Sequence, residues 1–152
     1  MKHPQRIAIG SDHAGYEAKE SIKRELAALG VEAVDKGAHS LESVDYPDFG
    51  ALVGRAVAGG EVERGVLICG SGIGISMAAN KIAGVRAALC WNEETARLAR
   101  EHNDANIICF GARFIEPAQA ARMVSVFMET EFAGGRHAAR VRKLSELDHA
   151  KE

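Results

Sequence analysis

Short apolar runs alternate with longer amphipathic segments along most of this chain. Five runs are predicted to be buried strands, at residues 6–10, 31–35, 66–69, 86–90 and 106–110. Between residues 16 and 29, Ala18, Ile22, Leu26 and Leu29 recur at helical spacing, and Gly30 provides a stop signal. Further helices are predicted at residues 48–58, 77–81, 93–101, 117–129 and 138–150.

Strands that alternate with helices predict an α/β fold, in which a five-stranded parallel sheet is covered by helices on both faces. In such folds ligands bind beyond the carboxyl ends of the strands, near a topological switch point. The first strand leads into Asp12, the third ends at Cys69, and His102 lies just before the fifth. No repeat, linker or low-complexity tract is visible, so residues 1–152 are expected to form one domain that ends in a C-terminal helix.

The composition narrows the class of protein. Of 152 residues, 47% are hydrophobic and only 5% are aromatic, which is typical of a globular chain whose helices pack closely on a sheet. The net charge of −2 gives no support for non-specific nucleic-acid binding, and no apolar run approaches the length of a membrane span. No signal peptide is visible, and three cysteines without a CxxC pair favour neither a disulfide framework nor a zinc site. The reducing cytoplasm is therefore the expected location.

The most informative segment is the glycine loop, residues 69–76, with the sequence CGSGIGIS. Its G-x-G-x-G spacing differs from the dinucleotide fingerprint, and it lacks the Lys-Ser/Thr ending of a P-loop. Backbone N–H groups at the start of the following helix would bind and stabilise an anion. The alternative is a plain strand-to-helix turn that uses glycine for packing.

Cys69 ends an apolar strand beside this loop, whereas Cys90 and Cys109 fit the role of small buried hydrophobic residues. A nearby helix N-terminus and open amides should favour the thiolate of Cys69. A thiolate acts either as a nucleophile or as a general base. The absence of a Cys-His-Asn protease signature favours the role of base.

Other polar residues flank the predicted strands. Asp12 beside His13 fits proton transfer or phosphate contact, and it equally fits a helix N-cap by Asp12 with His13 exposed. His102 lies at the end of a predicted helix, where the helix dipole favours an imidazolium. Asn103 fits either the site or a plain C-cap.

Arginines supply candidates for binding an anionic group. Arg136 and Arg140 are four residues apart and would share one face of a helix, which suits a phosphate. The alternative is a solvated basic stripe that continues through Arg142 and Lys143. Arg113, after the fifth strand, is a further phosphate candidate. No histidine pairs with cysteines or carboxylates at a metal-ligand spacing, so no metal site is predicted.

Six motifs, taken in order, resemble those of one enzyme family. They are SDHAG at 11–15, DYP at 45–47, CGSGIG at 69–74, AANK at 78–81, HNDAN at 102–106 and GGRH at 134–137. The chain is similar to the type B ribose-5-phosphate isomerases, which belong with the galactose-6-phosphate isomerase subunits in one sugar-phosphate isomerase family. The resemblance runs from about Ile7 to about Arg140 and so covers nearly the whole chain.

The resemblance implies a Rossmann-like three-layer α/β sandwich and a homodimer whose active sites are shared between subunits. It implies interconversion of D-ribose 5-phosphate and D-ribulose 5-phosphate through an enediolate, in the non-oxidative pentose phosphate pathway, without a metal or other cofactor. The preference among ribose, allose and galactose phosphates stays open, and so does the pairing of dimers into tetramers.

The resemblance also implies roles for individual residues. Cys69 would be the base that moves the proton between C1 and C2, and His102 would assist ring opening, with Asp12 as its partner. The amides that would hold the enediolate oxygens belong to Gly70, Ser71, Gly72, Ile73 and Gly74. The side chains that would line the sugar are Tyr46 and Asn103, and those that would hold the phosphate are His13, Arg113, Arg136 and Arg140.

One branch of this family lacks the cysteine and uses a carboxylate just after the last loop glycine. Ile75 occupies that position here, so Cys69 is the only candidate for the base. Two other hypotheses remain. A nucleotide- or flavin-binding module rests on the loop and the fold class alone, whereas a non-catalytic dimerisation partner is disfavoured because this chain carries the whole set of site residues.

Overall fold

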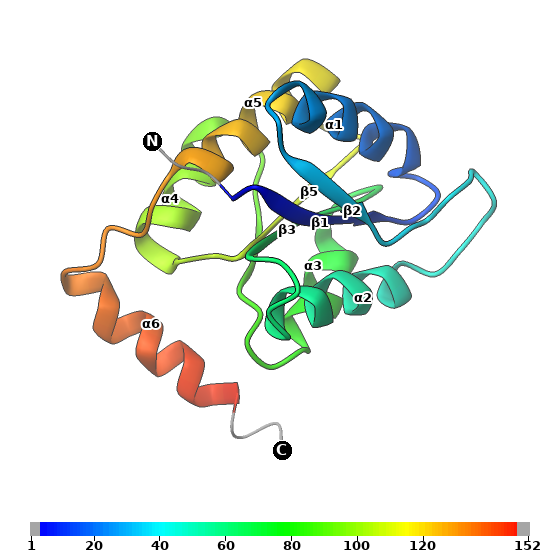
Figure 1. The fold of residues 1–152 in the computed structure, drawn as a ribbon. Helices are drawn as coiled ribbons and strands as arrows, with labels where there is room; N and C mark the ends of the chain where they lie inside the picture. The colour runs from blue at the N-terminus through cyan, green and yellow to red at the C-terminus, as the bar shows by residue number, and fades with distance from the viewer. Residues whose placement is uncertain (1–3, 149–152) are drawn as a thin grey trace.

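A computed structural model describes residues 4–148 as a three-layer α/β fold (Figure 1). Five parallel strands form one sheet in the order β2-β1-β3-β5-β4. The strands are β1 (Arg6–Ser11), β2 (Glu32–Asp35), β3 (Arg64–Cys69), β4 (Ala87–Leu89) and β5 (Ile107–Gly111). The helices are α1 (Tyr16–Ala28), α2 (Tyr46–Ala58), α3 (Ile73–Asn80), α4 (Glu93–Asn103), α5 (Pro117–Glu129) and α6 (Arg136–Glu146). The predicted fold class is confirmed.

Two apolar clusters determine which helices cover which face of the sheet. On one face α1, α4 and α5 pack against side chains such as Ile9, Ile68 and Phe110. On the other face α2 and α3 pack against Leu67 and Cys109. β3 is buried over its whole length, as expected for a parallel strand covered on both sides. In Figure 1, α6 extends away from these layers, and none of its described residues is buried.

Three predicted helix starts were wrong. α3 begins at Ile73, inside the glycine loop, because Gly72 adopts a φ of 80° and lets the chain turn directly into the helix. α2 begins at Tyr46, two residues earlier than expected. α6 begins at Arg136 and its described part ends at Glu146, while the predicted end at residue 150 lies outside the described residues.

The strand order places a topological switch point between β1 and β3. The chain leaves β1 toward β2 on one side, and β3, β5 and β4 lie on the other side. Ligands of such sheets bind in the crevice outside the carboxyl ends of the strands at this point. Asp12 follows β1 and Cys69 ends β3, so both lie at this crevice.

A buried ion pair supports the same edge of the sheet. Lys19 is fully buried, and its Nζ lies 2.6 Å from Oδ2 of Asp35 and 3.0 Å from Oε2 of Glu20. Oδ1 of Asp35 accepts the N–H of Gly37 at 2.8 Å. Burial alone would raise the pKa of Asp35, but hydrogen bonds from Lys19, Lys23 and the Gly37 amide outweigh it and lower that pKa.

The ion pair reaches the site through the backbone. The carbonyl oxygen of Gly37, held by Asp35, accepts the N–H of Ser11 at 2.7 Å. Ser11 precedes Asp12, so the pair fixes the end of β1. No helix within residues 4–148 is long and apolar enough to cross a membrane.

Candidate active site

Cys69 is the last residue of β3, and the glycine loop runs from it into α3. The residue is buried, and its Sγ accepts a hydrogen bond from the N–H of Gly72 at 3.1 Å. The N–H of Ile73 donates to Oγ of Ser71 at 3.2 Å. First-turn N–H groups have no acceptor within their own helix, so the amide of Gly74 is available to an anion near the thiol.

The loop packs tightly against β5, and this packing requires glycine. A Cβ atom on Gly72 would lie 2.6 Å from the carbonyl carbon of Phe110, and one on Gly111 would lie 2.5 Å from the carbonyl oxygen of Ser71. The packing role of the loop is therefore confirmed at Gly72. It is compatible with anion binding, because the same contacts fix the position of the neighbouring amides.

Tyr46 and Arg113 lie directly against the loop. A Cβ atom on Gly74 would lie 2.6 Å from the ring of Tyr46, and one on Gly70 would lie 3.1 Å from Cζ of Arg113. The two glycines thus allow an aromatic ring and a guanidinium to approach the loop backbone closely. Both side chains belong to exposed residues at the same edge of the sheet as Cys69.

Asp12 and His13 complete this group. The backbone N–H of Asp12 donates to the carbonyl oxygen of Ile68 at 3.3 Å, which places Asp12 beside Cys69. Its buried carboxylate accepts the N–H of Gly15 at 3.1 Å and so tightens the turn into α1, although the N-cap position itself is Gly15. Nδ1 of half-buried His13 accepts the N–H of Val44 at 3.1 Å, so a neutral ring carries its proton on Nε2, where it can donate to a ligand.

The remaining predicted residues lie at the opposite edge of the sheet. His102 and Asn103 are the last residues of α4, which returns from the end of β4 to the start of β5. The ring of His102 stacks on His137 with centroids 4.2 Å apart and planes 16° apart. His137 is the second residue of α6, so Arg136 is adjacent and exposed Arg140 follows one turn later.

The length of the strands separates these two groups. Cys69 pairs with Gly111 at the carboxyl end of β5, whereas His102 lies before Ile107 at its amino end. At about 3.3 Å per residue, the strand from Ile107 to Gly111 spans roughly 13 Å. The expected pairing of Asp12 with His102 therefore does not occur within one chain.

The other two cysteines have the buried role expected of them. Burial raises the pKa of the Cys90 thiol to about 11, against a smaller opposing hydrogen bond with Thr95. Burial, with the nearby Cys90 and Cys69, raises the pKa of Cys109 well above its ordinary value. Among the described cysteines, Cys69 alone has its sulfur bonded to the glycine loop. No group of three or more His, Cys, Asp or Glu side chains in residues 4–148 could hold a metal ion.

His137 was given no role by the sequence reasoning. Desolvation, followed by the positive charges of His102, Arg136 and Arg140, lowers its pKa, which favours a neutral ring against His102. Its position between two arginines in the sequence was the only available signal. The stacking partner is 35 positions away and could not be predicted from spacing.

Comparisons with known proteins show the family to which the chain belongs. The family model described as ribose/galactose isomerase matches residues 7–144. Ribose-5-phosphate isomerase B of Escherichia coli is 44% identical over 144 residues, which cover 95% of this chain and 97% of that protein. A probable ribose-5-phosphate isomerase B of Mycoplasma pneumoniae is 40% identical over 152 residues, 99% of each chain.

Solved structures show the same similarity. Ribose-5-phosphate isomerase B of Clostridium thermocellum superposes with a TM-score of 0.95 at 50% identity, over 97% of this chain and 99% of that one. The type B ribose 5-phosphate isomerase of Trypanosoma brucei gives a TM-score of 0.91 at 47% identity, over 94% of this chain and 98% of that one. The chain therefore belongs to the ribose/galactose isomerase family, in which it matches the type B ribose-5-phosphate isomerases.

Proposed function

We propose that this protein is an aldose–ketose isomerase that interconverts D-ribose 5-phosphate and D-ribulose 5-phosphate in the non-oxidative pentose phosphate pathway. The observation that carries the proposal is the thiol of Cys69, hydrogen-bonded to an amide of the glycine loop at the switch point of the sheet. The names of the similar proteins support the choice of substrate.

In the proposed reaction, the Cys69 thiolate removes the proton from C2 of the open-chain aldose. The electron pair of that C–H bond forms the C1=C2 bond, and negative charge develops on the oxygen at C1. Backbone amides of residues 70–74 stabilise this oxygen, and Gly74 is the foremost donor because the N–H groups of Gly72 and Ile73 already donate to Cys69 and Ser71. The loss of one such donor in other enzymes costs roughly 3–4 kcal/mol. A proton then passes from the C2 hydroxyl to the C1 oxygen, and the thiol returns its proton to C1. The base and the oxyanion donors all belong to the protein, so this scheme uses no metal.

We further propose a homodimer in which each site takes residues from both subunits. One subunit supplies Cys69, its loop, Tyr46, His13 and Arg113. The partner supplies the residues of the opposite edge, namely His102, Asn103, Arg136 and Arg140. His102 of the partner subunit and Asp12 then assist ring opening, and the arginines hold the phosphate. The support for this arrangement is the separation of the two groups in one chain.

The phosphate contacts lie away from the reacting carbons, and their contribution is orientation. Substrate held in the correct geometry for proton transfer loses much of its entropic barrier before the chemical step. The three free cysteines support a reducing cytoplasm as the location of the enzyme.

The test is an isomerase assay with ribose 5-phosphate on the wild-type protein, Cys69→Ala and Cys90→Ala. The general base typically contributes about 10²–10⁴-fold, so Cys69→Ala should lose at least that much kcat. Cys90→Ala removes a thiol from the core and should stay near the wild-type value. Substantial turnover by Cys69→Ala would exclude Cys69 as the base. A parallel panel with allose and galactose phosphates decides the substrate.

A further inference from the structure

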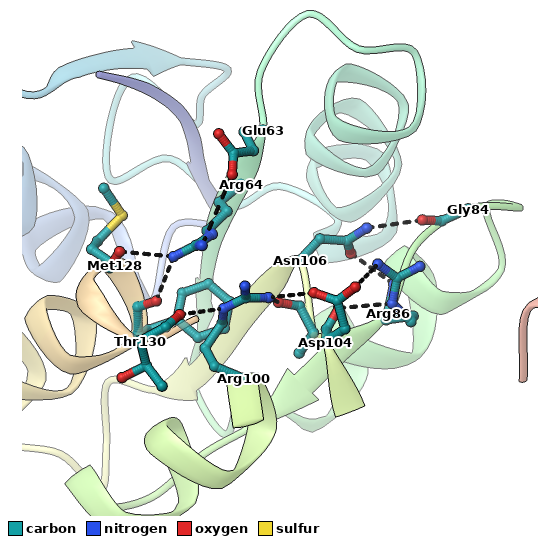
Figure 2. A network of polar contacts seen from close by, with 11 residues as sticks. Glu63, Arg64, Gly84, Arg86, Arg100, Asp104, Asn106, Met128 and Thr130 are labelled. Carbon is teal, nitrogen blue, oxygen red and sulfur yellow. Dashed lines mark hydrogen bonds and ion pairs between the residues drawn. The ribbon is translucent and has the colours of Figure 1, made fainter. Parts of the chain in front are cut away.

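A polar network at the amino edge of the sheet takes no part in the steps above. Figure 2 shows Arg86 and Arg100 converging on Asp104, while Arg64 and Arg100 bind carbonyl groups at the end of α5. We propose that Arg100 is a positioning residue for the isomerase reaction. It holds the last turn of α4, which carries His102, in a fixed relation to the segment that leads to α6. The inference rests on the function proposed above.

Arg100 joins two parts of the chain that are distant in sequence. It is 5% exposed, and its Nη1 donates to Oδ1 of Asp104 at 3.0 Å and to the carbonyl oxygen of Ala105 at 2.6 Å. Its Nε donates to the carbonyl oxygen of Thr130, just after α5, at 2.9 Å. The rigid guanidinium fork satisfies these acceptors together, which the point charge of a lysine cannot do in the same geometry.

Asp104 links Arg100 to the end of α4, where the proposed site residues His102 and Asn103 lie. It follows Asn103 directly and adopts a φ of 47°. Among the described residues, it is the only non-glycine residue with a positive φ. Its carbonyl oxygen accepts a hydrogen bond from Nε of Arg86 at 2.7 Å, and its carboxylate lies 3.5 Å from Nη2 of Arg86. A left-handed aspartate is uncommon and depends on such contacts. The network thus holds the C-cap of α4, two residues after His102, in place.

The other end of the connection leads to the proposed phosphate ligands. Thr130 stands six positions before Arg136. Between them, the N–H of Ala133 donates to the carbonyl oxygen of Glu101 at 3.1 Å, which holds the α5–α6 connection against the last turn of α4. Without the Arg100–Thr130 bond, the Ala133–Glu101 hydrogen bond and the His102–His137 stacking still join this connection and α6 to the end of α4, but the buried anchor between them is lost. The spacing between His102 and Arg136 is then less tightly fixed.

Arg64 provides a matched control. It is 7% exposed, its Nη1 donates to the carbonyl oxygens of Phe127 and Met128 at 2.8 Å each, and it lies 6.0 Å from the Phe127 ring centroid, against 5.8 Å for Arg100. Both arginines therefore bind the end of α5 and pack on the same ring. Within the described residues, only Arg100 of the two also donates hydrogen bonds to the turn after α4.

The experiment compares Arg100→Lys with Arg64→Lys at a temperature where circular dichroism shows both folded. Both should lose thermal stability. Arg100→Lys should lose roughly 10-fold to 100-fold in kcat/KM, with a raised KM, because a misplacement of about 1 Å can cost two orders of magnitude. Arg64→Lys should keep wild-type kinetics. The imidazole NMR signals of His102 should shift in Arg100→Lys and not in Arg64→Lys.

Wild-type kinetics and unchanged His102 signals in Arg100→Lys would overturn the inference, since Arg100 would then be structural only. If Arg100→Lys does not fold, Asp104→Asn replaces it. Asparagine tolerates the left-handed conformation, but it lacks the charge that Arg100 binds. Reduced kcat/KM with shifted His102 signals would then support the inference, and wild-type kinetics with unchanged signals would overturn it. If the wild-type protein does not isomerise ribose 5-phosphate, the proposed function fails. The NMR comparison then decides the positioning role by itself.

Discussion

The sharpest prediction concerns the division of the site between two chains. Cys69→Ala removes the proposed base at the carboxyl edge of the sheet, and His102→Asn removes the ring-opening histidine at the amino edge. Each homodimer should be inactive. The roughly 13 Å of β5 that separates the two edges prevents the two residues from serving one site within a single chain.

A mixture of the two variants should regain activity. Refolding them together in equal amounts pairs the chains at random, so about half of the dimers contain one chain of each kind. In a mixed dimer one site carries both lesions and the other carries none. The mixture should therefore show about a quarter of the wild-type activity per site.

The assay uses two affinity tags, so that mixed dimers are purified before ribose 5-phosphate is added. Because one of their two sites is intact, the purified mixed dimers should show about half of the wild-type activity per site. Cys69→Ala paired with Asp12→Asn is the matched control. Both lesions lie at the carboxyl edge, so every site in that mixed dimer keeps one of them and no activity should return. Inactive mixed dimers of Cys69→Ala with His102→Asn would refute the shared site.

Further predictions concern the structure around the site. Asp35→Asn removes one of the two carboxylates that pair with buried Lys19 and leaves Glu20. It should lower the free energy of unfolding, measured in urea, by about 3 kcal/mol, which is the lower end of the cost of breaking a buried ion pair. Because the pKa of Asp35 is lowered in the folded protein, its ion pair contributes its full stabilisation at pH values above the pKa of an unfolded aspartate, about 3.9. This stabilisation is lost as the pH falls through the pKa of Asp35 in the folded protein. Acid should therefore destabilise Asp35→Asn less than the wild type, and equal loss would contradict this assignment. Gly72→Ala should lose activity, because its Cβ would lie 2.6 Å from the β5 backbone. Gly30→Ala, at a φ of 76° with nothing within 4 Å of the added atom, should keep full turnover, and equal turnover of the two glycine variants would show that the loop tolerates displacement.

The sequence was sufficient for the elements that local pattern controls. All five strands were found because apolar residues recur in each of them, and β3 in particular is buried at every position. The start of α3 was missed because Ile73, Gly74 and Ile75 do not look like a helix start. The left-handed conformation of Gly72 determines that start, and it is a property of the backbone.

The placement of His102 within one chain differs from what the sequence grouping suggested. The sequence reasoning grouped it with residues at the carboxyl ends of strands, yet a residue just before a parallel strand lies at the amino end. The order of the elements along the chain already implied that His102 and Cys69 lie at opposite ends of the strands. The contacts of Arg100 with Thr130 and of Arg64 with Met128 could not be predicted in this way, because no periodicity relates positions so far apart.

Assembly and catalysis are coupled in the proposed dimer because the same helices serve both. α3 begins in the glycine loop and exposes Ile73 and Met77, one turn apart, by 48% and 62%. α6 carries Arg140 and Leu144, and Leu147 follows it directly; Leu144 and Leu147 are 46% and 63% exposed. Large apolar side chains left in water favour association, and here they lie on α3 and at the end of α6, the helices next to the two proposed halves of the site. In the proposed dimer, a contact that covers these side chains would also bring the thiol of one chain toward the arginines of the other, so a subunit that does not pair would lack a complete site.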